Sequence, residues 1–281
     1  IIYATADYLN AGGTFPAGST GSPSITFTTD TDTGIYRRGS GDIGFVSNST
    51  EIVNIDGNGL TVTSKDATIN SVSVGKGANS VAGNTVLGEG ALDAAVTGEN
   101  NTAIGKSSLT ALTSGESNVA LGHQSLASNT TGNSNIAIGK SALNVNTTTN
   151  NTLAIGRGAL QLNTSGNNNT ALGYVALNLN STGSNNLAAG NFSLDVNTTG
   201  SNNTAVGYAA LSGNTTASNN TAVGKLALNA NTTGGNNTAV GAAALDANTT
   251  GNQNTAVGEN ALTASSTGDS NTALGQDALR A

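Results

Sequence analysis

Several residue types are absent or scarce in this sequence of 281 residues. It has no cysteine, tryptophan or methionine, two prolines and one histidine, His123, while aromatic residues make up 3% and charged residues 9% of the chain. The absence of cysteine excludes a disulfide framework and a thiolate metal site. A single histidine excludes a multi-histidine metal site and argues against a Ser-His-Asp triad. The scarcity of large aromatic side chains excludes an ordinary globular core.

Charge and hydropathy exclude further classes of protein. Nine Lys and Arg against sixteen Asp and Glu give a net charge of −7, which argues against a nucleic-acid partner because phosphate binding needs clustered cations. No apolar run approaches the ~18 residues of a membrane-spanning helix, so no membrane insertion is predicted. No signal peptide is visible and the first residue is Ile1, so we expect the gene product to be longer than this chain.

An internal repeat accounts for most of the chain. From Asn84 to the end, a 17-residue unit recurs twelve times without an insertion. With Asn84 as position 1, every unit has glycine at position 5 and leucine at position 9. The leucines are Leu92, Leu109, Leu126, Leu143, Leu160, Leu177, Leu194, Leu211, Leu228, Leu245, Leu262 and Leu279.

The repeat predicts a β-solenoid with one coil per unit. Positions 2 to 4, such as Thr204-Ala205-Val206, indicate a short strand, and positions 8 and 9 a second one. Asn and Gly at positions 12, 15, 17 and 1 favour turns with left-handed backbone. Like residues then stack above like residues about 4.8 Å apart, so that twelve coils span roughly 58 Å.

The apolar positions of the predicted strand divide between two faces. Position 4 is Leu, Ile or Val in every unit except that of Ala189, and we expect it to fill the narrow interior together with the leucine at position 9. Position 3 is alanine in every unit except that of Val86 and should point the other way. A row of small apolar residues in water would be unfavourable, so we expect the alanines to be buried between chains or inside the coil. We interpret them as the seam of a homotrimer.

Position 6 differs from these uniform columns because its residues vary and are often charged. A solvated outer ridge of this kind is a natural place for specificity, although it can also serve solubility alone. The candidate receptor-contact residues in this column are Lys106, His123, Lys140, Arg157, Tyr174 and Tyr208.

The first 83 residues have a different organisation. Residues 1–22 are expected to be an extended linker, 23–69 a small β module, and 70–83 one irregular coil at the start of the solenoid. Within the module, alternation predicts a strand near Ile25, a turn over Asp30–Tyr36, and a strand, tight turn and second strand over Glu51–Leu60. A module of about 40 residues is too small to be stable alone without oligomerising.

Three motifs of the module, at residues 23–27, 32–36 and 55–60, closely resemble a module frequent in bacteriophage tail fibres. The repeats resemble those of the same phage proteins and of the heads of trimeric autotransporter adhesins, which form left-handed parallel β-rolls in threes. The resemblance implies an all-β, homotrimeric, left-handed solenoid that forms a structural fibre segment of a virion tail, outside the cell. The implied partners are other tail proteins and a host cell-surface glycan or protein receptor. The alternative is an adhesin head at a bacterial cell surface.

The same residues give little support for a catalytic, metal-binding or ice-binding function. Glycosidic cleavage needs two carboxyls about 5 to 9.5 Å apart, whereas Asp195 and Asp246 at position 10 should lie about 14 Å apart, so no enzymatic activity is predicted. The segments Asp30–Gly34 and Asp56–Gly59 resemble calcium loops but lack the closing Glu, so neither a metal nor another cofactor is predicted. Threonines at positions 13 and 14 suggest ice binding as a minor alternative, but only one of the two should face outward.

Overall fold

The computed structural model divides the chain into two compact units, Ile1–Ala67 and Thr68–Ala281. The residues that it describes are 19–23, 25–27, 30–39, 42–56, 59–62 and 66–280. Most of the predicted linker, residues 1–18, therefore lies outside the described residues.

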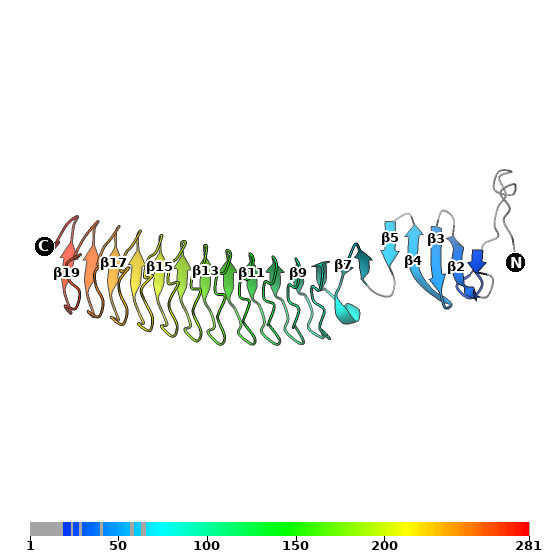
Figure 1. Ribbon diagram of the computed structural model, residues 1–281, viewed down its shortest axis with the longest axis horizontal. Helices are drawn as coiled ribbons and strands as arrows, with labels where there is room; N and C mark the ends of the chain where they lie inside the picture. The colour runs from blue at the N-terminus through cyan, green and yellow to red at the C-terminus, as the bar shows by residue number, and fades with distance from the viewer. Residues whose placement is uncertain are drawn as a thin grey trace. The chain divides into compact units, whose positions relative to one another are not determined.

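The first unit contains a five-stranded antiparallel sheet whose strands are ordered as in the chain (Figure 1). The strands are β1 (Ile25–Phe27), β2 (Asp30–Gly39), β3 (Asp42–Ser47), β4 (Thr50–Asp56) and β5 (Gly59–Val62). The strands predicted near Ile25 and over Glu51–Leu60 are confirmed. The turn predicted over Asp30–Tyr36 is wrong, because these residues belong to β2, which pairs with both β1 and β3. The β-branched Thr33 and Ile35 suit this strand.

Few of the described apolar side chains of this sheet are buried. Tyr36 and Val46 are buried, and the Tyr36 ring lies against the backbone of Gly44, where an added Cβ would come within 2.3 Å of a ring carbon. The Tyr36 hydroxyl donates a hydrogen bond to the Glu51 carboxylate. Several large apolar side chains of the same sheet remain exposed. They are Ile25, Ile43, Ile55 and Leu60.

The second unit is a parallel β-solenoid of about eleven 17-residue turns, as the repeat predicted (Figure 1). It starts with β6 (Ala67–Ile69), β7 (Val72–Gly75), the 3-10 turn η1 (Ala78–Ser80) and β8 (Thr85–Gly88), and β7 pairs antiparallel with β8. From β8 onward every pairing is parallel. The remaining strands are β9 (Thr102–Ile104), β10 (Val119–Leu121), β11 (Ile136–Ile138), β12 (Leu153–Ile155), β13 (Thr170–Leu172), β14 (Leu187–Ala189), β15 (Thr204–Val206), β16 (Thr221–Val223), β17 (Thr238–Val240), β18 (Thr255–Val257) and β19 (Thr272–Leu274).

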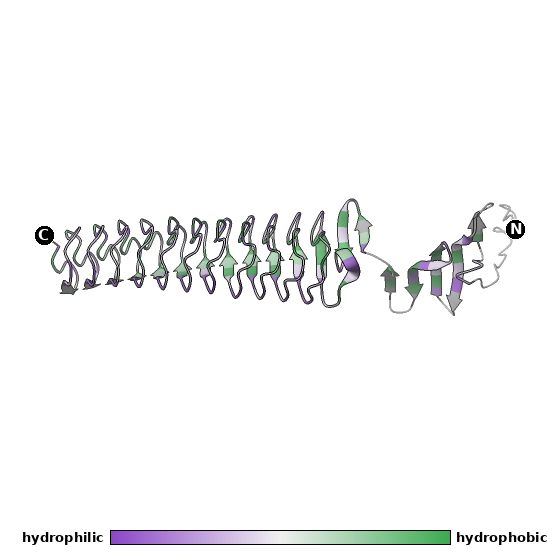
Figure 2. Ribbon diagram, turned by 90° about the horizontal axis from the view of Figure 1, so that it is seen from below, coloured by the Kyte–Doolittle hydropathy of each residue, from purple (hydrophilic) through white to green (hydrophobic). Residues whose placement is uncertain are grey.

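The register of the solenoid places identical repeat positions above one another. Ala205, for example, pairs with Ala188 in the preceding coil and with Ala222 in the next. Figure 2 shows the stacked strands along one side of the solenoid, with hydrophobic segments in green. Because each strand from β9 to β19 has only three residues, one residue per strand points inward and two point outward.

The prediction of which strand residue fills the interior is wrong. The alanines of position 3 are the inward residues: Ala205 and its equivalents have 0% exposure, apart from Ala273 at 2%, and they pack with the buried leucines of position 9. The branched residues of position 4 point outward, and Val223 and Val240 are 36% and 37% exposed. The alanine column is thus buried inside the coil, and the interpretation of it as a seam between chains is also wrong. The narrow coil has room for a methyl group opposite leucine, which explains the choice of alanine.

The second strand predicted at positions 8 and 9 is also wrong, since these residues form turns. The leucines of position 9 all have left-handed backbone, with φ of 53° at Leu211. Their backbone groups still bond from coil to coil: the N–H of Leu211 donates to the carbonyl of Ala227 at 3.0 Å. The backbone therefore satisfies its hydrogen bonds without an extended strand on this side.

Two buried asparagine columns complete the interior, at positions for which the sequence predicts turns. At position 1, the Asn203 carboxamide accepts the backbone N–H of Asn220 (3.0 Å) and donates to the carbonyl of Ala217 (2.9 Å). At position 12, the Asn214 amide donates to Asn197 Oδ1 (2.8 Å) and to the same Ala217 carbonyl (3.1 Å). The pattern recurs along the solenoid and links each coil to its neighbours through buried hydrogen bonds, which are costly to leave unmade.

The threonines of position 13 form a third ladder. The Thr198 hydroxyl donates to the carbonyl of Thr215 at 2.9 Å, and the Thr232 hydroxyl does the same to Thr249. These hydroxyls thus bond to the backbone of the next coil.

Candidate functional site

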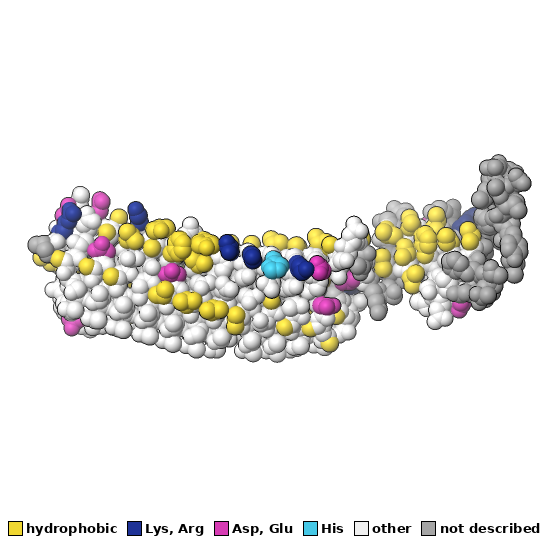
Figure 3. All heavy atoms as spheres, in the orientation of Figure 1, with side chains coloured by type: hydrophobic (Ala, Val, Ile, Leu, Met, Phe, Trp, Pro, Cys, Tyr) yellow, Lys and Arg dark blue, Asp and Glu magenta, His cyan; other side chains and the backbone are white. Residues whose placement is uncertain are grey.

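The candidate ridge of position 6 lies at the corner that follows each stacked strand. Glycine at position 5 turns the chain there, with φ of 132° at Gly156, for example. All six predicted contact residues are exposed. Figure 3 shows the histidine and several of the cations in one row along the solenoid.

The cations of the ridge differ in their partners. Lys106 forms an ion pair with Glu89 at 2.9 Å, one coil earlier in the same column. Within the described part of the chain, Lys140 and Arg157 form no ion pair. Lys225, the other cation of this column, also forms no ion pair among the described residues, but it lies four coils beyond Arg157, whereas Lys140 and Arg157 lie in adjacent coils.

Aromatic side chains follow the cations. The guanidinium carbon of Arg157 lies 5.9 Å from the centroid of the Tyr174 ring, a cation–π distance. Tyr174 contacts Phe192 edge-on at 5.4 Å between centroids, and Phe192 contacts Tyr208 at 5.8 Å. Phe192 is not among the residues predicted from the sequence, because it occupies position 7, beside the ridge. The sequence does show that Phe192 lies in the column next to the ridge, in the coil between those of Tyr174 and Tyr208, and this placement could have predicted the contact.

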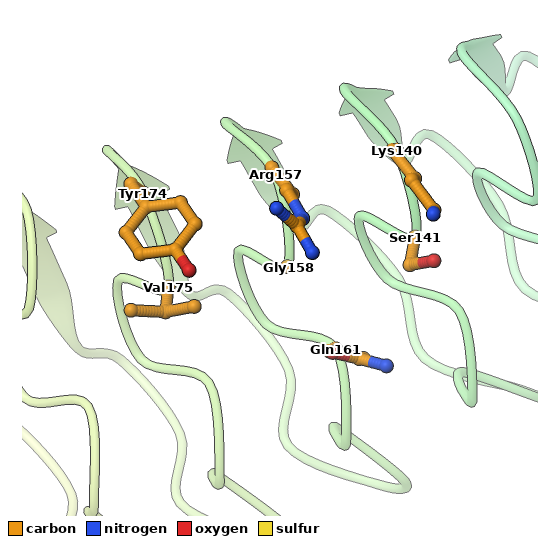
Figure 4. A pocket seen from close by; sticks show the side chains of 7 residues that line it. All are labelled: Lys140, Ser141, Arg157, Gly158, Gln161, Tyr174 and Val175. Carbon is orange, nitrogen blue, oxygen red and sulfur yellow. The ribbon is translucent and has the colours of Figure 1, made fainter.

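Three of the six predicted residues meet in a surface hollow of about 250 Å³ (Figure 4). Lys140, Arg157 and Tyr174 occupy successive coils along its rim, and Gln161 lies on the loop below them. The remaining lining residues are Ser141, Gly158 and Val175. Lys106, His123 and Tyr208 lie on the same column but do not line this hollow.

The carboxylates of position 10 lie at another place on the coil. Burial raises the pKa of the Asp195 carboxyl above its usual 3.8, against the opposing effect of a hydrogen bond with the Ser212 side chain, and burial likewise raises the pKa of Asp246. Asp195 Oδ1 is buried with no hydrogen-bond partner. Asparagines at this position donate to a carbonyl of the preceding coil, as Asn178 does to Gly158 at 2.7 Å. The absence of enzymatic activity stays a prediction.

Replacing Asp195 by Asn is expected to stabilise the solenoid at neutral pH by about 1 kcal/mol, because the new amide can donate to the Val175 carbonyl as Asn178 does to Gly158. The folded carboxyl keeps its proton to a higher pH than the unfolded one, so the natural chain loses stability as the pH rises from 3.8 through the raised pKa. The variant should lack this loss. Thermal melts of the natural chain and the variant between pH 3.5 and 7.5 measure this difference in stability. Asp195→Ala, which removes the charge without adding a donor, should also lose the part of the pH dependence that comes from Asp195, but it should remain less stable than Asp195→Asn. The part that comes from Asp246 should remain in all three proteins. Identical pH profiles for all three would refute the assignment.

Among the described residues, no three His, Cys, Asp or Glu side chains gather in a way that could hold a metal ion. In the same part of the chain no helix has the length and apolar character needed to cross a membrane. Comparison with known proteins gives no match to a family model, a curated protein or a solved structure.

Proposed function

We propose that this chain is a structural segment of a trimeric attachment fibre of the phage-tail type, outside the cell, which joins other tail proteins to a host-surface glycan or protein receptor. The observation that supports a structural role is the uninterrupted stack of about eleven turns, tied together by strand pairing and by asparagine and threonine ladders. In such a stack each coil is held by its neighbours along the whole length, which suits a stiff rod. The left-handed sense of the coil, as in adhesin heads, is part of the proposal.

The outward face of the stacked strands supports assembly from several chains. It presents the side chains of position 4, which are apolar in every unit, and those of position 2, which are threonine in eight of the twelve units and apolar at Val119, Ile136, Leu153 and Leu187. Exposed members are Leu87, Leu121, Ile136, Ile155, Val223, Val240, Val257 and Leu274. Contiguous apolar surface of this kind marks an interaction site. The seam of the proposed homotrimer is therefore this face and not the alanine column.

The occupant proposed for this face is another copy of the chain. A partner that covers the outward side chains of every coil must repeat with the same spacing over the same length, and a second solenoid aligned in parallel does so. The exposed isoleucines of the first unit, Ile25, Ile43 and Ile55, are further apolar surface that assembly would cover. Three copies around an axis give each chain two neighbours.

The mass of the particle in solution tests this proposal. We expect three times the chain mass of 27.4 kDa by light scattering. Placing lysines on the strand face, with Val223→Lys and Val240→Lys together, should dissociate the assembly, because like charges would then be buried against one another. The matched control, Thr233→Lys with Thr250→Lys on exposed positions of the same coils, should keep the trimeric mass. A stable monomer for the natural chain would contradict the trimer.

A further inference from the structure

We propose that the hollow between Lys140, Arg157 and Tyr174 binds a carboxylate-bearing sugar residue of an acidic polysaccharide. The inference deepens the attachment function proposed above, since it names the chemical class that the ridge would recognise. It follows from the donors that line the hollow, from the aromatic ring at its end, and from the missing side chain at Gly158.

The polar groups that line the hollow are mainly hydrogen-bond donors. Lys140 and Arg157 contribute cations that have no ion-pair partner among the described side chains. The Gln161 Oε1 atom already accepts a hydrogen bond from Asn178 at 3.4 Å, so its amide nitrogen is the group left to donate. Since no acidic side chain lines the hollow, its chemistry selects an anion, and a planar guanidinium suits a carboxylate in particular.

Tyr174 adds an aromatic surface on which the ring of a sugar can pack beside the cations. Its side chain is 41% exposed and lies at one end of the hollow (Figure 4). The Arg157 guanidinium, 5.9 Å from the ring centroid, is positioned by the cation–π contact. A pyranose placed with its apolar face on the free surface of the ring can direct a carboxylate to Arg157 and Lys140. The volume of about 250 Å³ is just below the ~300 Å³ of the smallest drug-sized pockets and suits one sugar residue.

Gly158 creates the space. It occupies position 7, where neighbouring coils carry Ser141 and Val175 with the same left-handed backbone. A Cβ on Gly158 would lie 3.3 Å from a Val175 methyl carbon and 3.4 Å from the Gln161 side chain, so even a small side chain would fill the floor of the hollow. Its φ of 67° is close to that of Gln124 at the same position, so glycine is not required there by the backbone.

Calorimetric titration of the full chain with a trimer of galacturonic acid, compared with a neutral trimer of galactose, tests the proposal. We expect the carboxylated sugar to bind at least tenfold more tightly than the neutral one. Arg157→Gln and Tyr174→Leu should each weaken its binding tenfold or more. Gly158→Gln, which keeps every charge, should also weaken it at least tenfold, because the new side chain occupies the hollow.

Lys225→Gln is the matched control, because it removes one positive charge from the same exposed column four coils beyond Arg157. It should change the affinity less than twofold, and thermal melts should show all variants folded. Equal binding of the two sugars, no binding of the acidic one, an unchanged affinity for Gly158→Gln, or an equal loss for Lys225→Gln and Arg157→Gln would each overturn the proposal. Light scattering on the same samples reports assembly separately, so a failed titration and a failed trimer are distinguishable.

Discussion

Replacing Leu211 by Asp is expected to unfold the coils around it. The Leu211 side chain has no exposed surface and packs in the continuous apolar interior with the alanines of position 3. Truncating a buried leucine to alanine alone costs about 2–5 kcal/mol, and a carboxylate in this interior has no cation to pair with, which adds to the cost. Backbone strain does not contribute to this loss of stability, because aspartate tolerates the left-handed φ of this position better than leucine does.

Leu179→Asp is the matched control for this prediction. Leu179 lies at position 11 of its coil and is 38% exposed, so the same substitution should leave the solenoid folded, with a change within about 0.5 kcal/mol. Because each coil contacts its immediate neighbours, amide hydrogen exchange should locate the damage of Leu211→Asp in the coils next to it before the stack melts as a whole. Equal melting temperatures for the two variants would show that the interior has been assigned wrongly.

The 17-residue period of the sequence predicted the solenoid, but not which residue of each strand points into its interior. Glycine and leucine recur every 17 residues, and this spacing alone sets the coil length and the stacking of like positions. Alternation could not choose between positions 3 and 4, because both are apolar and a three-residue strand has too few residues to show a pattern. The choice depended on the width of the interior. Leucine and two asparagine columns already occupy it, which leaves room for alanine. The single inward valine, Val86, belongs to a unit whose position 12 is Ala95 and not asparagine.

The asparagines show a second limit of prediction from the sequence alone. Asparagine is a common turn former, so positions 1, 12 and 17 look alike in the sequence. Position 17 also accepts serine and glutamine, as at Ser134 and Gln253, and it lies at an exposed turn with left-handed backbone. Position 1 is asparagine in all units except that of Thr152. Uniformity is therefore the signal of the buried ladder at position 1, since a turn alone would tolerate several residue types. Position 12 gives no such signal, because it carries Ala95, Leu112 and Ser265 besides its asparagines.

The ridge could be predicted from its composition, whereas the hollow within it could not. Variable charged residues in one column indicate exposure, and the structure confirms the exposure of all six candidates. Which of them meet depends on neighbouring columns. Gly158 and Phe192, both at position 7, decide where the ridge is hollow and where it is filled by an aromatic ring.

Replacing Gly207 by Ala is expected to destabilise the solenoid by about 3 kcal/mol or more. Gly207 lies at position 5 with φ of 136°, a backbone conformation that residues with a Cβ rarely adopt. A Cβ there would lie 2.5 Å from the carbonyl oxygen of Gly224 in the next coil and 2.6 Å from its carbonyl carbon. Backbone atoms cannot move aside as a side chain can, so the two coils would have to separate and lose strand pairing between β15 and β16.

Gly90→Ala separates this clash from the general cost of a left-handed alanine. Gly90 has φ of 61°, and the nearest atom to an added Cβ is 3.9 Å away. At the equivalent position of a later coil, Ala209 adopts a φ of 52°. The control should therefore cost about 1–2 kcal/mol, the usual price of this conformation for a residue with a Cβ. Denaturant unfolding of the two variants measures the difference. An equal loss for both would mean that the coils can separate at position 5 without cost, and that the glycine column is needed only for its backbone conformation.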